Sequence, residues 1–369
     1  MKIAYLVLKG MPLGGGIEKY TEEVGSRLVQ RGHKVTVYAM RHYGAVNGVH
    51  RGMHIKTVGT IKSKSFEKIT ASLSATLHET LHGKADIVHF HAFGPSMFCS
   101  IPRLFGRRVI VQGHGIEWQR SKWNTAGRLF LKLMEWPSVM LPHALTAVSK
   151  IQKDYIFHKY GRECRYIPTG VNTPVREAPD LIKQYGLSGD DYILFAARLV
   201  REKGAHYLIE GYNRLRTDKK LVIAGDAQHE GAYKKELRAL AGGNNNIVFT
   251  SFATGKLLHE LFSNCCVFVL PSEIEGLSTA LLEAMSYGNC CLVSDIPENR
   301  EALNGLGYTF RNKDAQDLSD KLAFLLNDRG AIGKFKREAQ DHVLRNFSWD
   351  DIAMQFETFY IDILKSGGR

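Results

Sequence analysis

Short apolar runs alternate with longer amphipathic segments along most of the chain. The runs are rich in Val, Ile, Leu and Phe, and each ends at a glycine, a proline or a polar loop, which predicts buried strands. The predicted strands cover residues 2–8, 34–39, 86–90, 109–111, 145–149, 192–197, 221–224, 247–250, 267–270 and 290–293.

The segments between these runs carry apolar residues at helical spacing. We predict helices over residues 17–31, within 59–84, over 128–139 with an interruption at Pro137, over 150–160, from 205, over 279–287, from 298, over 315–327 and over 349–365. Strands that alternate with helices form right-handed β-α-β units. The pattern therefore predicts an α/β protein.

Length and composition narrow the class of protein. A chain of 369 residues is too long for one core and favours two domains. No apolar run approaches the roughly 20 residues that cross a bilayer, and the apolar run before Lys9 is too short for a signal peptide. The 6 cysteines lack metal-ligand spacing, so we expect reduced core thiols in the cytoplasm.

Positive charge is concentrated in the first half of the chain. Residues 1–172 contain 25 Lys and Arg against 10 Asp and Glu, whereas residues 173–369 contain 24 against 27. This excess predicts an anionic partner such as a phospholipid headgroup or a polyprenyl-diphosphate carrier. Because the cations are dispersed and no recognition motif is present, nucleic acid is not the expected partner. Charge that only keeps the protein soluble is the alternative.

The segment 271–297 carries the most informative chemistry. A loop with Glu275 follows a predicted strand, and Ser278 or Thr279 can cap the next helix, on which Glu283 lies. Ligands of α/β sheets bind at such loops, and the free N–H groups of a first helical turn attract anions. Two acids beside an anion site fit a nucleotide sugar, with hydroxyls on both sides of a diphosphate. The alternative is an ordinary crossover with two solvated acids.

Two other loops add candidate phosphate contacts. Arg198 and Lys203 lie at the two ends of one short loop after a predicted strand, and paired cations suit a diphosphate. Gly15 and Gly16 precede the first helix, where a backbone without Cβ atoms can approach a phosphate or a sugar. A solvated basic loop and an ordinary turn are the alternatives.

A histidine and a polar aromatic loop follow another strand. His114 lies between two glycines, where its ring can form a hydrogen bond with a sugar hydroxyl. The next residues combine groups that stack on sugars with groups that pair with phosphates: Glu117, Trp118, Arg120 and Lys122. They are candidates for the acceptor side. The alternative is a helix start held by aromatic packing.

Three runs together resemble a known family. They are EGLSTALLEAMSYGNCCLVSDIPENRE at residues 275–301, GGGIE at 14–18 and ARLVREKG at 197–204. They resemble retaining GT-B glycosyltransferases of family four, over nearly the whole chain. The run HGIEWQRSKW at residues 114–123 is also similar to a run in bacterial enzymes that build surface polysaccharides.

The resemblance implies a domain organisation. The α/β fold would be GT-B, with two Rossmann-like, doubly wound domains facing across a cleft. Residues 1–172 would form the acceptor-side domain and residues 173–349 the nucleotide-sugar-binding domain. A C-terminal helix within residues 350–369 would cross back to the first domain.

The resemblance also implies site residues. Catalytic roles fall on His114, Arg198, Lys203 and Glu275, and donor contacts on Gly15, Gly16, Arg198, Lys203, Gly276, Leu277, Ser278, Thr279 and Glu283. Glu275 is expected to hold sugar hydroxyls and Glu283 the ribose. The chain departs from the family at Ala227 and Ser251, where glycine is common near the nucleobase, so the base stays open.

The implied reaction is retaining sugar transfer without a metal or other cofactor. No Asp-x-Asp motif is present to chelate a metal, and the two cations take its place. UDP is the first expectation for the donor nucleotide, with GDP and dTDP as alternatives. We expect a lipid-linked or cell-surface polysaccharide acceptor and a peripheral location on the inner face of the cell membrane. A catalytically silent nucleotide-sugar-binding subunit and transfer to a soluble small molecule are the alternatives.

Overall fold

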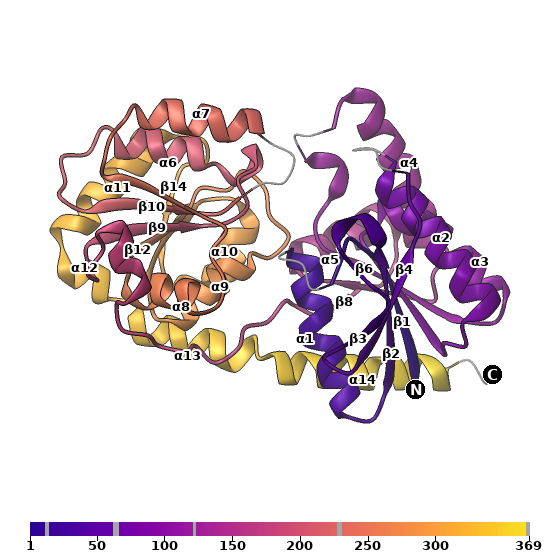
Figure 1. The fold of residues 1–369 in the computed structure, drawn as a ribbon. Helices are drawn as coiled ribbons and strands as arrows, with labels where there is room; N and C mark the ends of the chain where they lie inside the picture. The colour runs from indigo at the N-terminus through magenta and orange to yellow at the C-terminus, as the bar shows by residue number, and fades with distance from the viewer. Residues whose placement is uncertain (12–14, 62–65, 121–122, 227–230, 367–369) are drawn as a thin grey trace. The chain divides into compact units, whose positions relative to one another are not determined.

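The chain divides into two compact units. A computed structural model describes residues 1–11, 15–61, 66–120, 123–226 and 231–366. Unit 1 contains Met1–Gly170 together with Trp349–Arg369, and unit 2 contains Val171–Ser348 (Figure 1). Each unit is built on one sheet, and each is described separately below.

The sheet of unit 1 has the strand order β3-β4-β2-β1-β5-β6-β7-β8. Its strands are β1 (Lys2–Leu8), β2 (Lys34–Met40), β3 (Gly48–His50), β4 (Met53–Val58), β5 (Ile87–His91), β6 (Arg108–Gly113), β7 (Ala144–Ala147) and β8 (Arg165–Tyr166). All neighbours are parallel except β3 and β4. The apolar runs therefore form a parallel sheet, as their pattern predicts.

Helices cover both faces of this sheet. The helices of unit 1 are α1 (Gly16–Gln30), α2 (Glu67–His82), α3 (Ser100–Leu104), α4 (Thr125–Met140), α5 (Lys150–Tyr160) and α14 (Trp349–Lys365). Ala71 of α2, Val139 of α4 and Ile156 of α5 share one buried cluster with Leu6 of β1. Helices α1 and α14 pack against each other, and Tyr5 of β1 points to α14. Because neighbouring strand residues point to opposite faces, α1 and α14 cover the second face.

Helix α14 follows unit 2 in the chain but completes the core of unit 1. Its buried face includes Trp349, Phe356 and Tyr360. The Tyr360 hydroxyl lies 3.1 Å from the Tyr5 hydroxyl and 2.7 Å from Nδ1 of His89. A terminal helix that returns to the first unit is what the family resemblance implies.

Unit 2 contains a fully parallel sheet in the order β11-β10-β9-β12-β13-β14. Its strands are β9 (Tyr192–Ala196), β10 (Lys220–Ala224), β11 (Ile247–Ser251), β12 (Val267–Leu270), β13 (Cys290–Ser294) and β14 (Tyr308–Phe310). Its helices are α6 (Ala205–Tyr212), α7 (Gly231–Ala241), α8 (Gly255–Asn264), α9 (Thr279–Ser286), α10 (Pro297–Leu303), α11 (Ala315–Asn327), α12 (Arg329–Gly333) and α13 (Lys336–Asn346).

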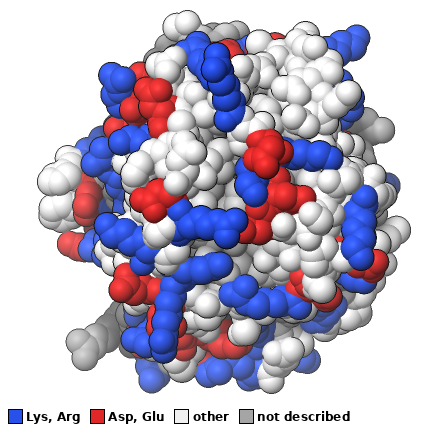
Figure 2. All heavy atoms as spheres, turned by 90° about the vertical axis from the view of Figure 1, so that its left-hand side faces the viewer, with Lys and Arg blue, Asp and Glu red and all other residues white. Residues whose placement is uncertain are grey.

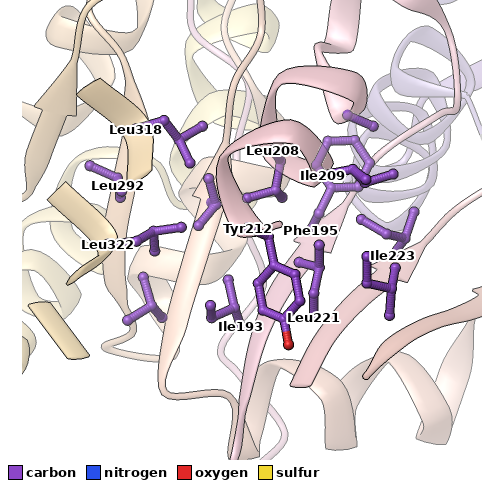
Figure 3. Close-up of a cluster of buried hydrophobic side chains, with 14 of the residues drawn as sticks. Ile193, Phe195, Leu208, Ile209, Tyr212, Leu221, Ile223, Leu292, Leu318 and Leu322 are labelled. Atoms are coloured by element: carbon purple, nitrogen blue, oxygen red, sulfur yellow. The ribbon is translucent and has the colours of Figure 1, made fainter. Parts of the chain in front are cut away.

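The core of unit 2 explains its continuous apolar runs. Figure 3 shows side chains of β9 and β10, such as Phe195 and Ile223, packed with Leu208 of α6 and Leu318 of α11. Each strand of a parallel sheet is buried on both faces, so its sequence is apolar throughout rather than alternating. The six cysteines are free and buried, as the sequence predicts for core thiols.

The sequence analysis was wrong at Pro137 and missed several elements. Helix α4 does not stop at Pro137 but continues to Met140, and Leu141 N–H donates to the Pro137 carbonyl over 3.1 Å. The strands and α-helices that were not predicted are β3, β4, β8, β14, α3, α7, α8, α12 and α13. Strands β3 and β4 pair antiparallel, and the turn between them uses Arg51 and Gly52, both with positive φ, as tight hairpins do. Within the described residues, no helix is both long and apolar enough to cross a membrane.

Replacing Phe356 with alanine tests how much α14 contributes to unit 1. Phe356 is fully buried, so the change is expected to lower the free energy of unfolding by about 3–5 kcal/mol. Met354 on the same helix is 47% exposed, and Met354→Ala is expected to change it by less than about 0.5 kcal/mol. Thermal and chemical unfolding of both variants measure the difference. Equal effects would contradict the packing of α14 described here.

Candidate active site

Two loops of unit 2 meet at the carboxyl edge of its sheet. One follows β9 and ends at Gly204, and the other follows β12 and begins at Pro271. Gly204 has a φ of 70°, and a Cβ atom there would lie 1.9 Å from the Pro271 carbonyl oxygen. The Glu273 N–H donates to the Glu202 carbonyl over 2.9 Å. Only glycine permits this approach, which fixes one loop against the other.

An ion pair between Lys203 and Glu275 joins the same two loops. Nζ of Lys203 donates to Oε1 of Glu275, and the two side chains are 15% and 7% exposed. Sequence reasoning placed these residues on different parts of a ligand, and the structure brings them together. Charges so shielded from water need further hydrogen bonds to be stable, and phosphates and hydroxyls of a ligand supply such partners. The pair therefore places two opposite charges side by side at the carboxyl ends of β9 and β12.

Glu273 anchors the second loop from outside this pair. Its carboxylate accepts a hydrogen bond from the Tyr207 hydroxyl at 3.0 Å and pairs with Lys313 at 3.0 Å. Burial, together with the charge of Glu273, raises the pKa of Tyr207 to about 12. Because the Glu273 carboxylate already binds Tyr207 and Lys313, we interpret Glu273 as an acid that holds the loop in place and not as one that binds a ligand.

Helix α9 begins beside the loop that carries Glu275. Ser278 is the cap, because its Oγ accepts a hydrogen bond from the Leu281 N–H at 3.4 Å. Glu283 lies further along the helix and is partly exposed. The remaining predicted donor contacts lie at the start of the helix: Gly276, Leu277 and Thr279. The helix N-terminus is thus in the position that the sequence predicts for an anion site.

Arg198 is not part of the Lys203–Glu275 pair. It follows β9 directly and its side chain is exposed. Within the described residues, its guanidinium contacts neither Lys203 nor Glu275. The long exposed side chain has the reach to meet a phosphate, but the structure alone does not bring the two predicted cations together.

Ser251 stands where the resemblance implies a glycine, and it has a backbone conformation that glycine favours. Its φ of 61° lies in the left-handed region, which costs a residue with a Cβ atom some stability. The Ser251 carbonyl accepts a hydrogen bond from the Gly225 N–H at 2.8 Å, which holds this conformation. Ala227, the other departure, lies outside the described residues.

The sequence analysis missed an acid at the start of α10. Burial, with the nearby charges of Glu275 and Glu301, raises the pKa of Glu298. The loop before it is tied to the Glu275 loop, because the Ser294 hydroxyl donates to the Ser272 carbonyl over 2.5 Å. The signal for Glu298 was its place after β13, at the same carboxyl edge of the sheet.

In unit 1, His114 stands at the end of a chain of buried hydrogen bonds. Its Nε2 lies 2.9 Å from Nδ1 of His91, whose Nε2 lies 3.2 Å from Oγ1 of Thr21 on α1. Burial lowers the pKa of His114 to about 3, against an opposing effect of Glu117, and lowers that of His91 well below its ordinary value. Both imidazoles are therefore neutral, and one donates to the other.

Gly15 and Gly16, at the start of α1, differ in the space beside their backbones. A Cβ atom on Gly15 would lie 2.0 Å from Oε2 of Glu18, whereas one on Gly16 would meet nothing within 4 Å. Glu18 in turn accepts a hydrogen bond from the Lys9 N–H at 3.0 Å. The contact with Glu18 is a reason for glycine at position 15 that needs no ligand. Of the two glycines, Gly16 is the one with open space beside its backbone.

The candidate acceptor residues pack more tightly than sequence reasoning proposed. The Trp118 Nε1–H donates to Oε2 of Glu135 over 3.1 Å, and Nζ of Lys132 lies 4.3 Å from the Trp118 ring centre. Arg120 pairs with the buried Glu117 at 3.4 Å. Lys122 lies outside the described residues. Trp118 is held by α4, which favours the packing alternative for this side chain.

Acidic, histidine and cysteine side chains form no metal-binding cluster in the part of the chain that the structure describes. The polar groups described at the unit 2 sheet edge include two lysines, Lys203 and Lys313, several carboxylates and the start of a helix. Such an arrangement can bind the phosphates and hydroxyls of one extended polar ligand.

Comparisons with known proteins agree with this chemistry. A model of glycosyltransferase family 4 matches residues 14–174, and a model of glycosyl transferases group 1 matches residues 178–342. An uncharacterised glycosyltransferase of Methanocaldococcus jannaschii is 26% identical and covers 100% of both chains. A GDP-mannose-dependent phosphatidylinositol monomannoside mannosyltransferase of Mycobacterium tuberculosis is 26% identical over 94% of this chain and 95% of its own.

Solved structures support the fold. Anabaena HepE in complex with UDP and glucose has a TM-score of 0.82 at 18% identity, covering 98% of this chain and 100% of that chain. The two family models together span most of the sequence, one on each unit. The chain therefore belongs to the family 4, group 1 glycosyltransferases and is a glycosyltransferase with the GT-B fold.

Proposed function

We propose that this enzyme transfers a sugar from a nucleotide sugar to a lipid-linked or cell-surface polysaccharide acceptor, with retention of the anomeric configuration. The observation that carries the proposal is the shielded Lys203–Glu275 pair beside the start of α9. A cation, a carboxylate and a helix N-terminus at one sheet edge suit a diphosphate flanked by hydroxyls. The relative from M. tuberculosis uses GDP-mannose, and HepE binds UDP, which supports a nucleotide-sugar donor.

In this proposal the protein acts mainly through charge. As the bond between the anomeric carbon and the phosphate oxygen breaks, Arg198, Lys203 and the first turn of α9 stabilise the negative charge that grows on the diphosphate. The acceptor hydroxyl attacks the same face of the sugar, and its proton passes to the departing phosphate oxygen. The products are the glycoside and the nucleoside diphosphate.

Carboxylates and a histidine orient the donor in this scheme. Glu275 accepts hydrogen bonds from the sugar hydroxyls and Glu283 from the ribose. His114 binds another sugar hydroxyl as a neutral imidazole, which its lowered pKa favours. The two cations supply the charge that a divalent metal ion would otherwise supply, so we propose no metal.

Two observations support a lipid-linked acceptor: the positive charge of the first half of the chain, and the substrate named for the M. tuberculosis relative. The excess of positive charge lies in residues 1–172. Figure 2, which views unit 2 from the left of Figure 1, shows Lys and Arg interspersed with Asp and Glu. The M. tuberculosis relative acts on a phosphatidylinositol mannoside. We therefore propose a peripheral enzyme at the inner face of the cell membrane, with transfer to a soluble acceptor as the alternative.

A donor panel tests the proposed reaction. We expect nucleotide release from one member of a panel of UDP-, GDP-, dTDP- and ADP-sugars, without added metal and in the presence of a lipid-linked acceptor. Glu275→Gln is expected to lower kcat about 100-fold, because a charge-assisted hydrogen bond contributes about 1.5–3 kcal/mol. Glu236→Gln is the matched control, since Glu236 lies on α7 and pairs with exposed Arg201.

Three results of this panel are informative. Release that Glu275→Gln lowers about 100-fold and Glu236→Gln leaves intact supports the proposal. Thermal stabilisation by a nucleotide without release, even with acceptor present, would favour a silent binding subunit. An absence of both release and stabilisation would contradict the donor site itself.

The pH dependence of activity tests the state of His114. A pKa of about 3 keeps the imidazole neutral throughout the range in which an ordinary histidine titrates. We therefore expect kcat/KM for nucleotide release to show no histidine titration between about pH 6 and 8, and His114→Asn to leave the profile unchanged in shape. A fall in kcat/KM with a midpoint near pH 6.5 that disappears in His114→Asn would show that His114 titrates, and would contradict a neutral His114 imidazole.

Substitution of His91 tests whether it orients His114. His91→Leu removes the partner 2.9 Å from His114 and is expected to lower kcat about tenfold, the equivalent of one hydrogen bond. Asparagine carries a nitrogen near the position of Nδ1, so His91→Asn is expected to recover most of the activity. Equal losses in the two variants, with unchanged unfolding midpoints, would argue against an orienting hydrogen bond.

A further inference from the structure

Helix α4 exposes large apolar side chains along one face. Leu129, Leu133 and Trp136 are 59%, 58% and 54% exposed, and their spacing of four and three residues places them on one side of the helix. The opposite side buries Leu131 and Val139 in the core of unit 1. A helix with one apolar face in the core and a second facing outward is not explained by folding alone.

The neighbouring helix α3 also exposes large apolar side chains. Leu104 and Phe105, at the end of this helix, are 84% and 62% exposed. Cys99 Sγ donates to the Pro137 carbonyl at 3.5 Å, and Arg103 donates to the carbonyl of Leu141, so these two contacts join the α3 segment to the end of α4. We call Leu104, Phe105, Leu129, Leu133 and Trp136 the α3–α4 surface.

The exposed charged side chains of α3 and α4 are cations. Residues 68–141 contain 9 Lys and Arg against 4 Asp and Glu. Three of the four acids, Glu79, Glu117 and Glu135, are buried. On α4 itself, Arg128 and Lys132 are exposed. Arg103 on α3 is exposed as well, and the acid on these two helices, Glu135, is buried, so the outward charge of α3 and α4 is positive.

We propose that the α3–α4 surface docks on an anionic phospholipid bilayer. Its apolar side chains enter the boundary between headgroups and acyl chains, and Trp136 suits that boundary because it is apolar with one N–H. Arg128 and Lys132 pair with lipid phosphates while their stems lie along the apolar layer. This inference deepens the proposed function, because it rests on an acceptor that is itself held in a membrane.

A second copy of the chain is the other occupant to consider. In a two-fold contact, the same patch faces itself, so the cations around the α3–α4 surface would face cations. Such like-charged contacts are unfavourable, whereas an anionic bilayer complements them. Charge therefore favours the bilayer.

Co-sedimentation of the whole protein with vesicles tests the proposal. We expect binding to phosphatidylcholine vesicles that contain phosphatidylglycerol, and much weaker binding to pure phosphatidylcholine or at high salt. The double variant Leu133→Ser/Trp136→Ser is expected to lower the partition coefficient at least about tenfold. Arg128→Gln is expected to lower it about fivefold.

The control is Met354→Ser, which removes an exposed apolar side chain from α14 in the same unit. It is expected to bind vesicles like the unmodified protein, and the unfolding midpoints of all variants should agree. Failure to bind anionic vesicles would overturn the proposal, as would binding that the double variant does not weaken. A double variant that changes the oligomeric state but not vesicle binding would assign the surface to a second copy and also overturn it.

This test separates the surface from the reaction. Vesicle binding is measured without any nucleotide-sugar donor. If the protein binds vesicles but releases no nucleotide, the proposed function is contradicted and the membrane-docking proposal for the α3–α4 surface is supported. Nucleotide release with a lipid-linked acceptor, but without vesicle binding, would support the reaction and overturn the α3–α4 surface.

Discussion

In unit 2, the loop after β9 and the loop after β12 are in backbone contact, because Gly204 has no side chain to separate it from the Pro271 carbonyl. The contact between Lys203 and Glu275 depends on that approach. The approach brings Lys203 within reach of Glu275, although the two are far apart in sequence. A side chain at position 204 would move the loops apart and separate the charges. The glycine is therefore as much a part of the candidate site as the two charged groups.

The candidate residues of unit 1 rely on burial rather than on charge. His91 is fully buried and His114 is partly buried and hydrogen-bonded to it, and burial lowers the pKa of both imidazoles. A neutral imidazole with one nitrogen occupied has a single nitrogen left for a ligand. His114 can therefore make one hydrogen bond to a ligand, through its second ring nitrogen. A solvent-exposed histidine would have both ring nitrogens available.

Sequence reasoning succeeded where one physical signal was sufficient. Strands buried on both faces leave continuous apolar runs, and the cap at Ser278 follows from its place before a helix. It failed at β3, because this strand is short and exposed and has no such run. It also expected Pro137 to interrupt α4, but the packing of the helix outweighs one missing hydrogen bond. Which side chains meet across loops, such as Lys203 with Glu275 and His91 with His114, depends on the fold and leaves no local pattern.

The position of α14 in the chain has a consequence for how the protein is made. Unit 2 is continuous in sequence, whereas unit 1 needs Trp349–Lys365 to cover one face of its sheet. A ribosome synthesises the strands of unit 1 first but delivers α14 only after all of unit 2. Tyr5 and His89 must therefore wait with exposed surface until the helix arrives. Unit 2 can complete its core first, and during synthesis unit 1 is the part that is exposed to aggregation and most in need of a chaperone.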